Sequence, residues 1–181
     1  MKAIALRRSP VDPVAPDTRM QLIADSAIVG AGRPLFLPDF APSWIGRIGV
    51  ACRISRLGKD IAPRFADRYA DAYCLCLHLI PKGIDVTDAR GGLFDNCLAL
   101  GPWRQLPDGG TIEVAGVDFL QALDLGDVDF RGAIAAVSRY ATLKTGDIIV
   151  AAFIHDVADV NAGDDICVRV DGEEALATRV R

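Results

Sequence analysis

The sequence is short of several features that mark common functional classes. Its five cysteines include no Cys-x-x-Cys pair, and their odd number argues against a disulfide framework. With two histidines and no Gly-x-Ser-x-Gly segment, the chain has little material for a Ser-His-Asp triad. These absences argue against a disulfide-rich secreted domain and a serine hydrolase, and they favour a reducing, cytoplasmic location.

The chain also lacks an excess of basic charge and a long hydrophobic run. Its 20 Lys and Arg and 24 Asp and Glu give a net charge of −4, whereas nucleic acid and anionic membranes are bound by clustered basic surfaces. The longest apolar stretch, Leu75–Ile80, is interrupted by His78 and is too short to span a bilayer. We therefore expect neither a nucleic-acid partner nor a membrane partner.

What the sequence does contain predicts a β-rich domain. With 181 residues, of which 51% are hydrophobic, the chain is long enough to form one domain over residues 1–181. Short β-branched and aromatic runs, bounded by Gly, Pro or Asp, predict the following strands: Ala3–Leu6, Leu35–Leu37, Ile45–Ile54, Tyr73–Ile80, Thr111–Val114, Ile148–Phe153, Ile166–Val170 and Ala175–Val180.

Two segments are predicted to be helical instead. Phe130, Ile134, Val137 and Ala141 recur at helical spacing after Asp127 and Asp129, either of which could cap the helix. A shorter helix is predicted at Pro63–Tyr69, because proline suits the first turn of a helix. The fold class is therefore β-rich α+β with few short helices.

Three potential metal ligands alternate along one predicted strand. Cys74, Cys76 and His78 should share one face of that strand. Neighbouring positions on one face lie about 7 Å apart, which is too spread for easy closure of a tetrahedral zinc site. We favour buried core cysteines over a zinc site.

Motifs along most of the chain resemble the fumarylacetoacetate hydrolase family. The most specific are Leu-Gly-Pro-Trp at 100–103 and Thr-Leu-Lys-Thr-Gly-Asp-Ile-Ile at 142–149, and the strand Trp-Ile-Gly-Arg-Ile-Gly-Val-Ala-Cys-Arg-Ile-Ser-Arg at 44–56 resembles a metal-binding strand of that family. The resemblance implies a rolled mixed β-sheet, dimerisation, and cleavage, decarboxylation or isomerisation of oxo-acids. Family members usually hold a divalent cation on carboxylates.

The departures from the family pattern fall on its chemistry. Ile45 and Arg47 stand at the positions of the family's first acidic pair, and the third carboxylate position falls near His78. Gly92 stands at the position of the active-site lysine, and the apolar segment Ala151–Ile154 replaces the Thr-Gly-Thr-Pro loop. A hard divalent cation demands oxygen ligands, so we expect no bound metal and no other cofactor.

One hypothesis is an altered enzyme that acts on a small oxo- or enol-acid. The guanidinium of Arg47 would supply the positive charge that a metal normally offers to a carboxylate or a developing enolate. His78 would shuttle protons, because the unperturbed pKa of histidine lies near neutrality. The expected activity is metal-independent isomerase, decarboxylase, C–C lyase or hydrolase chemistry.

The alternative hypothesis is a non-catalytic family member. Some relatives, such as the decarboxylase/isomerase of homoprotocatechuate breakdown, carry two copies of the fold, and their amino-terminal copy lacks the metal ligands. This chain resembles such a copy standing alone. It would then be an interaction partner in a heteromer with an active family subunit, whereas the altered enzyme would be a homodimer.

Three further residues are weaker candidates for the site. His155, which follows a predicted strand together with Asp156, stands where the family's substrate loop would be, although a solvated turn is the simpler interpretation. Asp95 and Lys82 are further candidates for substrate binding, with a backbone-bonded turn and a charged surface loop as their alternatives. Arg7, at the end of the first strand, is expected to be solvated.

Overall fold

Two β-sheets and an α-helix make up the part of the protein that the computed structural model describes, which is residues 1–7, 19–84, 89–106, 111–115 and 123–181. The larger sheet is mixed and has the strand order β2-β1-β10-β4-β5-β6-β3, with β7 paired to β5. Its strands are β1 (Ala3–Arg7), β2 (Arg19–Ile23), β3 (Ile28–Val29), β4 (Trp44–Ile54), β5 (Ala70–Pro81), β6 (Leu98–Leu100), β7 (Arg104–Gln105) and β10 (Ile148–Val160).

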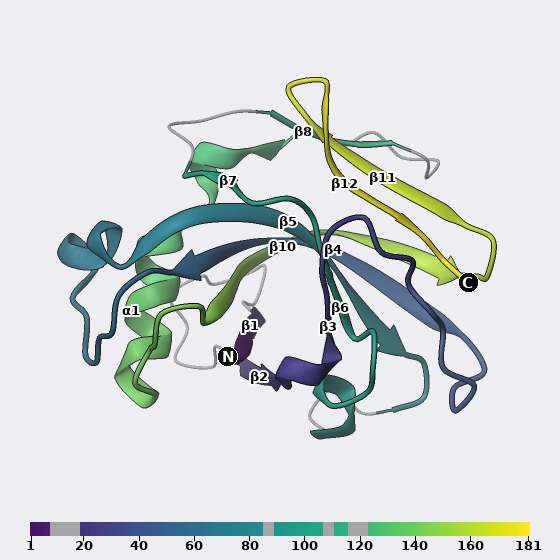
Figure 1. The fold of residues 1–181 in the computed structure, drawn as a ribbon, viewed down its shortest axis with the longest axis horizontal. Coiled ribbons are helices and arrows are strands. Elements are labelled where there is room, and N and C mark those ends of the chain that lie inside the picture. The colour runs from purple at the N-terminus through teal and green to yellow at the C-terminus, as the bar shows by residue number, and fades with distance from the viewer. Residues whose placement is uncertain (8–18, 85–88, 107–110, 116–122) are drawn as a thin grey trace.

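The smaller sheet lies beside the long strands of the larger one (Figure 1). Its order is β12-β11-β8-β9, formed by β8 (Thr111–Ala115), β9 (Leu123–Asp124), β11 (Asp165–Val170) and β12 (Glu173–Arg179). Four 3-10 turns are described, namely η1 (Asp25–Ala27), η2 (Pro63–Arg68), η3 (Ala89–Gly92) and η4 (Leu125–Asp127). Within the described residues, no helix is both long and apolar enough to cross a membrane.

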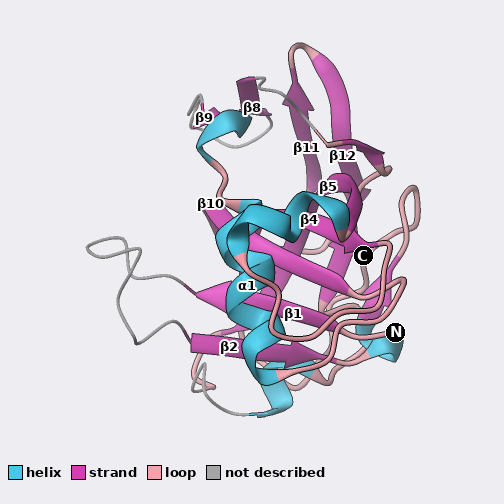
Figure 2. Ribbon diagram, turned by 90° about the vertical axis from the view of Figure 1, so that its left-hand side faces the viewer, coloured by secondary structure: helices cyan, strands magenta, loops and turns pink. Residues whose placement is uncertain are grey.

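Helix α1 (Phe130–Tyr140) confirms the predicted helix and its cap. The Asp129 side chain accepts a hydrogen bond of 2.7 Å from the Gly132 backbone N–H, which satisfies one of the unpaired donors of the first turn. Ile134 and Val137 are buried, as the apolar stripe predicts. The helix packs against η2 and β10, and Figure 2 shows it lying across the strands of the larger sheet.

The two faces of the larger sheet pack against different cores. Along β4, Ile48 and Val50 point into a large core shared with α1 and the smaller sheet. Ala51 points the other way, into a core of mainly small side chains that also contains Ile23 of β2 and Leu98 of β6. Because β2 and β6 lie far apart in the strand order, the sheet must curl around this second core (Figure 1). The predicted rolled mixed sheet is thus confirmed.

The structure corrects the predicted extent of several strands. The predicted strand Ile148–Phe153 continues as β10 to Val160, because the backbone keeps pairing with β4 through three irregularities while the polar side chains turn outward. Leu35–Leu37 is not a full strand, although Leu35 forms a bridge with Val180. Strand β2 was missed because its short sequence, Arg-Met-Gln-Leu-Ile, has little apolar alternation.

The carboxylate of Asp147 joins the start of β1 to the start of β10. It is 2% exposed, accepts hydrogen bonds from the backbone N–H groups of Lys2 (3.1 Å) and Lys144 (2.8 Å), and pairs with the Lys2 ammonium. Asp147→Ala should lower the free energy of unfolding by about 2–4 kcal/mol, because it removes a buried carboxylate and leaves its partly buried donors unpaired.

Urea denaturation measures this effect, with Asp71→Ala as the control. Asp71 also pairs with a basic side chain, Arg53, but both side chains are substantially exposed, so its loss should cost less than about 1 kcal/mol. Equal losses for the two variants would contradict the role given to Asp147.

Candidate functional site

Arg47 and His78 lie directly opposite one another on neighbouring strands. In the antiparallel pairing of β4 with β5, Arg47 is the register partner of His78, and Ile45 is that of Ile80. Directly opposed residues project on the same side of a sheet. The predicted proximity of Arg47 and His78 is confirmed, whereas their chemical roles remain predictions.

Phe153 of β10 completes this side of the site. Its ring stacks on the His78 ring with a centroid distance of 5.7 Å and an interplanar angle of 24°, and the Arg47 guanidinium carbon lies 6.0 Å from its centroid. Gly49 gives it room, because a Cβ atom at this position would come within 3.0 Å of the Phe153 ring. The predicted strand position of Phe153 is confirmed, but its contacts with His78 and Arg47 were not predicted from the sequence.

Arg7 also lies in this region, and the expectation that it is solvated is wrong. Its side chain is half-buried, its Nη2 donates a hydrogen bond of 3.1 Å to Oε1 of Gln21, and its Nε is buried without a hydrogen-bond partner. Burial and the positive charge of Arg47 lower the pKa of Arg7, whereas the carboxylate of Asp156 raises it. These electrostatic interactions place Arg7 close to Arg47.

His78 is fully buried and neutral at physiological pH. Burial, assisted by the charges of Arg7 and Arg47, lowers its pKa from 6.5 to about 3. The backbone of Gly91 opposes this shift, but neither Nδ1 nor Nε2 has a partner at hydrogen-bonding geometry. The proton-shuttle hypothesis assumed a pKa near neutrality, which His78 does not have in this structure.

The buried polar side-chain atoms without partners coincide in one place. Among the described residues, these atoms are Nε of Arg7 and both ring nitrogens of His78. Such atoms are uncommon in folded proteins, and a functional site is one physical explanation for them. We call Arg7, Arg47 and His78 the arginine–histidine cluster.

Asp156 places a negative charge next to the cluster. It is the register partner of Arg47 on β10, and its two carboxylate oxygens lie 3.1 and 3.2 Å from Nε of Arg47. The side chains are 28% and 51% exposed for Arg47 and Asp156, respectively. A pair this open to water contributes under about 1 kcal/mol to stability. Asp156 was expected in a solvated turn and instead lies within β10.

The other predicted site residues do not join the cluster. His155 pairs with Ile48, whose side chain faces the opposite core, so strand alternation directs His155 away from His78. Lys82 forms an ion pair with Asp159. Asp95 is exposed in a turn between η3 and β6. Their proposed contacts with substrate remain predictions.

Gly92, which the sequence resemblance aligns with a lysine position, has a structural role. A Cβ atom there would lie 2.1 Å from the carbonyl oxygen of Leu22, and the Gly92 carbonyl accepts a hydrogen bond of 2.9 Å from Ala24. This contact ties η3 to the edge of β2. A lysine at position 92 would therefore require the backbone to move.

The residues that the sequence resemblance aligns with metal-ligand positions do not fit a divalent metal. Ile45 and Arg47 offer no lone pair, and His78 alone offers a single imidazole. Among the described residues, no group of three His, Cys, Asp or Glu side chains could hold a metal ion. Cys76, on the same face of β5 as His78, is buried, which raises the pKa of its thiol to about 12.

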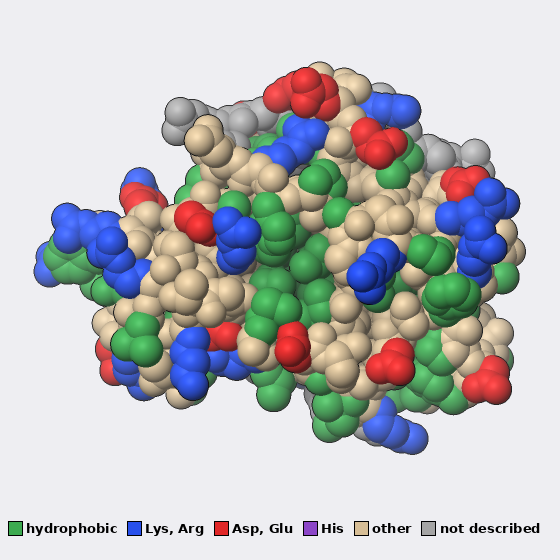
Figure 3. Space-filling view, viewed as in Figure 1, with side chains coloured by type: hydrophobic (Ala, Val, Ile, Leu, Met, Phe, Trp, Pro, Cys, Tyr) green, Lys and Arg blue, Asp and Glu red, His purple; other side chains and the backbone are tan. Residues whose placement is uncertain are grey.

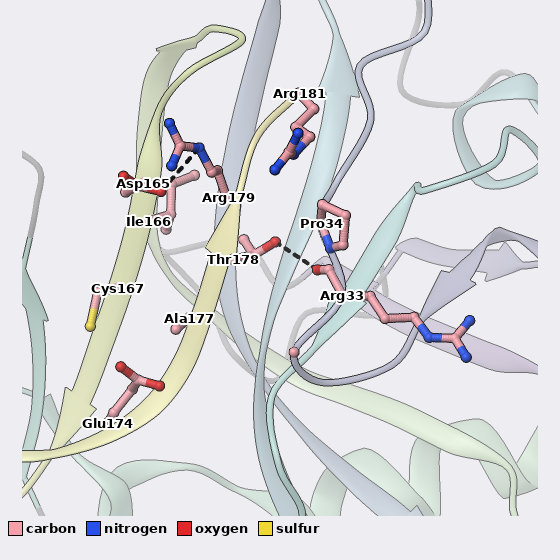
Figure 4. A pocket seen from close by; sticks show the side chains of 11 residues that line it. Arg33, Pro34, Asp165, Ile166, Cys167, Glu174, Ala177, Thr178, Arg179 and Arg181 are labelled. Atoms are coloured by element: carbon pink, nitrogen blue, oxygen red, sulfur yellow. Dashed lines mark hydrogen bonds and ion pairs between the residues drawn. The ribbon is translucent and has the colours of Figure 1, made fainter.

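A concave region lies on the smaller sheet. This groove, of about 440 Å³, is lined by residues that include Arg33, Arg179 and Arg181 (Figure 4). Its polar groups are exposed or paired: Arg179 lies 3.9 Å from Asp165, and Thr178 donates a hydrogen bond of 3.3 Å to the Arg33 carbonyl oxygen. We place the candidate site at the arginine–histidine cluster, because buried polar atoms lack partners there.

The molecular face seen in Figure 3 has a hollow lined with hydrophobic side chains. Acidic and basic side chains are interspersed around this hollow. Opposite charges are therefore mixed on this face. In the cluster, by contrast, two side chains of the same charge, Arg7 and Arg47, lie close together.

The burial of His78 should make stability depend on pH. Above its ordinary pKa of 6.5 the ring is neutral in both states; between 6.5 and about 3, only the unfolded chain takes up the proton. Stability should therefore fall as pH falls, by about 1.4 kcal/mol per pH unit from this residue. Urea denaturation at pH 7, 6, 5 and 4.5 should give a shallower decline for His78→Gln than for the unchanged protein.

His155→Gln is the control, because it removes the other histidine, which is partly exposed. This variant should retain the decline with falling pH that the burial of His78 causes. The test compares how the free energy of unfolding changes with pH, so it remains valid even if His78→Gln lowers stability at every pH. Identical slopes for His78→Gln and the unchanged protein would contradict a buried, neutral His78 ring.

Comparison with known proteins identifies the fold. No protein-family profile and no curated protein matches the sequence. The structure is similar to fumarylpyruvate hydrolase from Pseudomonas aeruginosa in complex with Mn²⁺ and pyruvate, with a TM-score of 0.83, 19% identity, and coverage of 99% of this chain and 89% of that chain.

Two further solved structures give the same result. 5-Carboxymethyl-2-hydroxymuconate delta-isomerase from Mycobacterium smegmatis has a TM-score of 0.82 and 23% identity, with 99% of this chain and 78% of that chain covered. Maleylpyruvate hydrolase from Sphingobium sp. SYK-6, in complex with manganese and pyruvate, has a TM-score of 0.81 and 23% identity, with 99% and 69% covered. The chain therefore has the fold of the fumarylacetoacetate hydrolase family.

Proposed function

We propose that the protein binds a small oxo- or enol-acid at the arginine–histidine cluster and acts on it without a carboxylate-bound divalent metal. The observation that carries this proposal is the coincidence of two guanidinium groups with three buried, unpartnered polar atoms. An anion there would reduce the repulsion between Arg7 and Arg47 and give their donors an acceptor. Arg47 and His78 also stand at former ligand positions of the resembled metal site.

The chemistry follows from these groups. A guanidinium binds a carboxylate through charge-assisted hydrogen bonds, and its positive charge stabilises the enolate that develops in isomerisation, decarboxylation or C–C cleavage of an oxo-acid. Neutral His78 has one N–H donor and one acceptor nitrogen, so it can hydrogen-bond to the ligand. The negative charge of a bound ligand would also raise the pKa of His78, which would bring the ring closer to proton transfer at neutral pH.

The ligands of two structural relatives support the choice of an oxo-acid. Two of them, the P. aeruginosa fumarylpyruvate hydrolase and the Sphingobium maleylpyruvate hydrolase, are described in complex with manganese and pyruvate. Pyruvate is the simplest oxo-acid, and its carboxylate suits a guanidinium. In this chain, arginine would provide the positive charge at the metal's place.

Calorimetric titration with pyruvate tests the proposal. The protein should bind pyruvate equally well with EDTA and with Mn²⁺, and Arg47→Gln should weaken binding about tenfold or more, because it removes a charged donor. Arg53→Gln is a closely matched control: Arg53 lies on the same strand and face, pairs with Asp71, and lies 5.3 Å from the Trp103 ring. Binding that requires Mn²⁺, or equal losses in both variants, would contradict the proposal.

The non-catalytic alternative has two observations in its favour. His78 is 0% exposed, and the segment Ala151–Ile154 forms part of a continuous strand instead of an open substrate loop. Assays of oxo-acid decarboxylation, enol–keto isomerisation and acylpyruvate cleavage distinguish the two functions. Pyruvate binding without any turnover would favour a binding subunit, which co-purification with an active family member would support further.

A further inference from the structure

We propose that Asp156 is an internal competitor of the ligand: its carboxylate holds Arg47 in the free protein and is displaced when an acid binds. This inference rests on the proposed function of the arginine–histidine cluster. Asp156 pairs with Arg47 across β10 and β4, and its oxygens lie 3.1 and 3.2 Å from Nε of that residue. A carboxylate of this protein thus occupies one donor of the guanidinium that would receive the ligand.

The geometry of this pair makes displacement feasible. Both oxygens of Asp156 approach the same nitrogen of Arg47, whereas Asp71 binds Arg53 with two parallel hydrogen bonds of 3.0 Å, from Nε and from Nη2. Two-pronged pairs are the stronger and more specific arrangement. The Arg47–Asp156 pair is therefore the more easily exchanged of two ion pairs on one face of one strand.

The position of Asp156 also allows it to move without disrupting the sheet. Its side chain is 51% exposed, and register irregularities flank it on β10, between Phe153 and His155 and between Val157 and Val160. A rotation of the side chain toward water breaks no backbone pairing. By contrast, other side chains of the site are held by contacts within the protein. The rings of His78 and Phe153 stack on each other, and Arg7 donates a hydrogen bond to Gln21.

Asp156 also contributes a negative charge that a ligand would replace. Its charge raises the pKa of Arg7, opposing the lowering by burial and by Arg47. It therefore offsets part of the repulsion between the two guanidinium groups in the free protein. A ligand carboxylate would offset the same repulsion in place of Asp156. While the Asp156 carboxylate stays in place, however, its negative charge repels the incoming anion.

The test is the affinity for pyruvate of Asp156→Asn, which keeps the shape of the side chain and removes its charge. Affinity should rise about two- to fivefold, the range expected for losing competition from an exposed ion pair. The matched control Asp71→Asn removes the partner of Arg53 and should leave affinity unchanged. In an Arg47→Gln background, Asp156→Asn should have a markedly smaller effect, because the competition acts through Arg47.

The outcomes separate this inference from the proposed function. If pyruvate binds in an Arg47-dependent manner and Asp156→Asn weakens binding or leaves it unchanged, the competitor role is wrong and the proposed function stands. If Asp156→Asn raises affinity equally with and without Arg47, the effect is general charge repulsion, and the competitor role is again wrong. If pyruvate binds to neither the unchanged protein nor Asp156→Asn, both are wrong.

Discussion

The pairing of β4 with strands on both of its sides is the constraint on which the candidate site depends. In this register Arg47 has His78 on one side and Asp156 on the other. A slip of one residue in either pairing would turn side chains to the opposite core, because successive residues of a strand face opposite sides of the sheet. The buried apolar residues of β4 that face α1 and the smaller sheet hold this register in place.

Two glycines adapt the fold to these side chains. Gly49 leaves room for the ring of Phe153, which contacts both His78 and Arg47. Gly92 allows η3 to approach β2, which bears Gln21, the partner of Arg7. Gly92 is thus part of the packing around the cluster. Arg47, His78 and Gly92 therefore belong to one packed environment.

The features of the fold and site that could be predicted from sequence depend on local rules or on the family resemblance. The Asp129 cap follows from the first turn of a helix, and the proximity of Arg47 and His78 follows from the family resemblance, which aligns both with metal-ligand positions. Arg7 could not be placed in the same way, because its approach depends on the curl of the sheet.

The contacts of Phe153 and the strand position of Asp156 were missed for a different reason. The mixed polar and apolar sequence after Val150 lacks regular alternation, and the irregular pairing of β10 with β4 explains why. The depressed pKa of His78 likewise requires knowledge of its burial, since sequence supplies only the ordinary value. A bulged strand at an expected loop position would have been the signal to seek.

The central claim is that an organic anion binds at the arginine–histidine cluster, where the ring nitrogens of His78 are buried without partners. ¹⁵N NMR of these imidazole nitrogens tests it most directly. In EDTA-treated protein at neutral pH, the free state should show a neutral ring, consistent with a pKa of about 3. Saturating pyruvate should shift these nitrogen resonances, because the ring gains a hydrogen-bond partner and a nearby negative charge. Resonances that stay unchanged at saturating pyruvate, or that shift only after Mn²⁺ is added, would contradict the account.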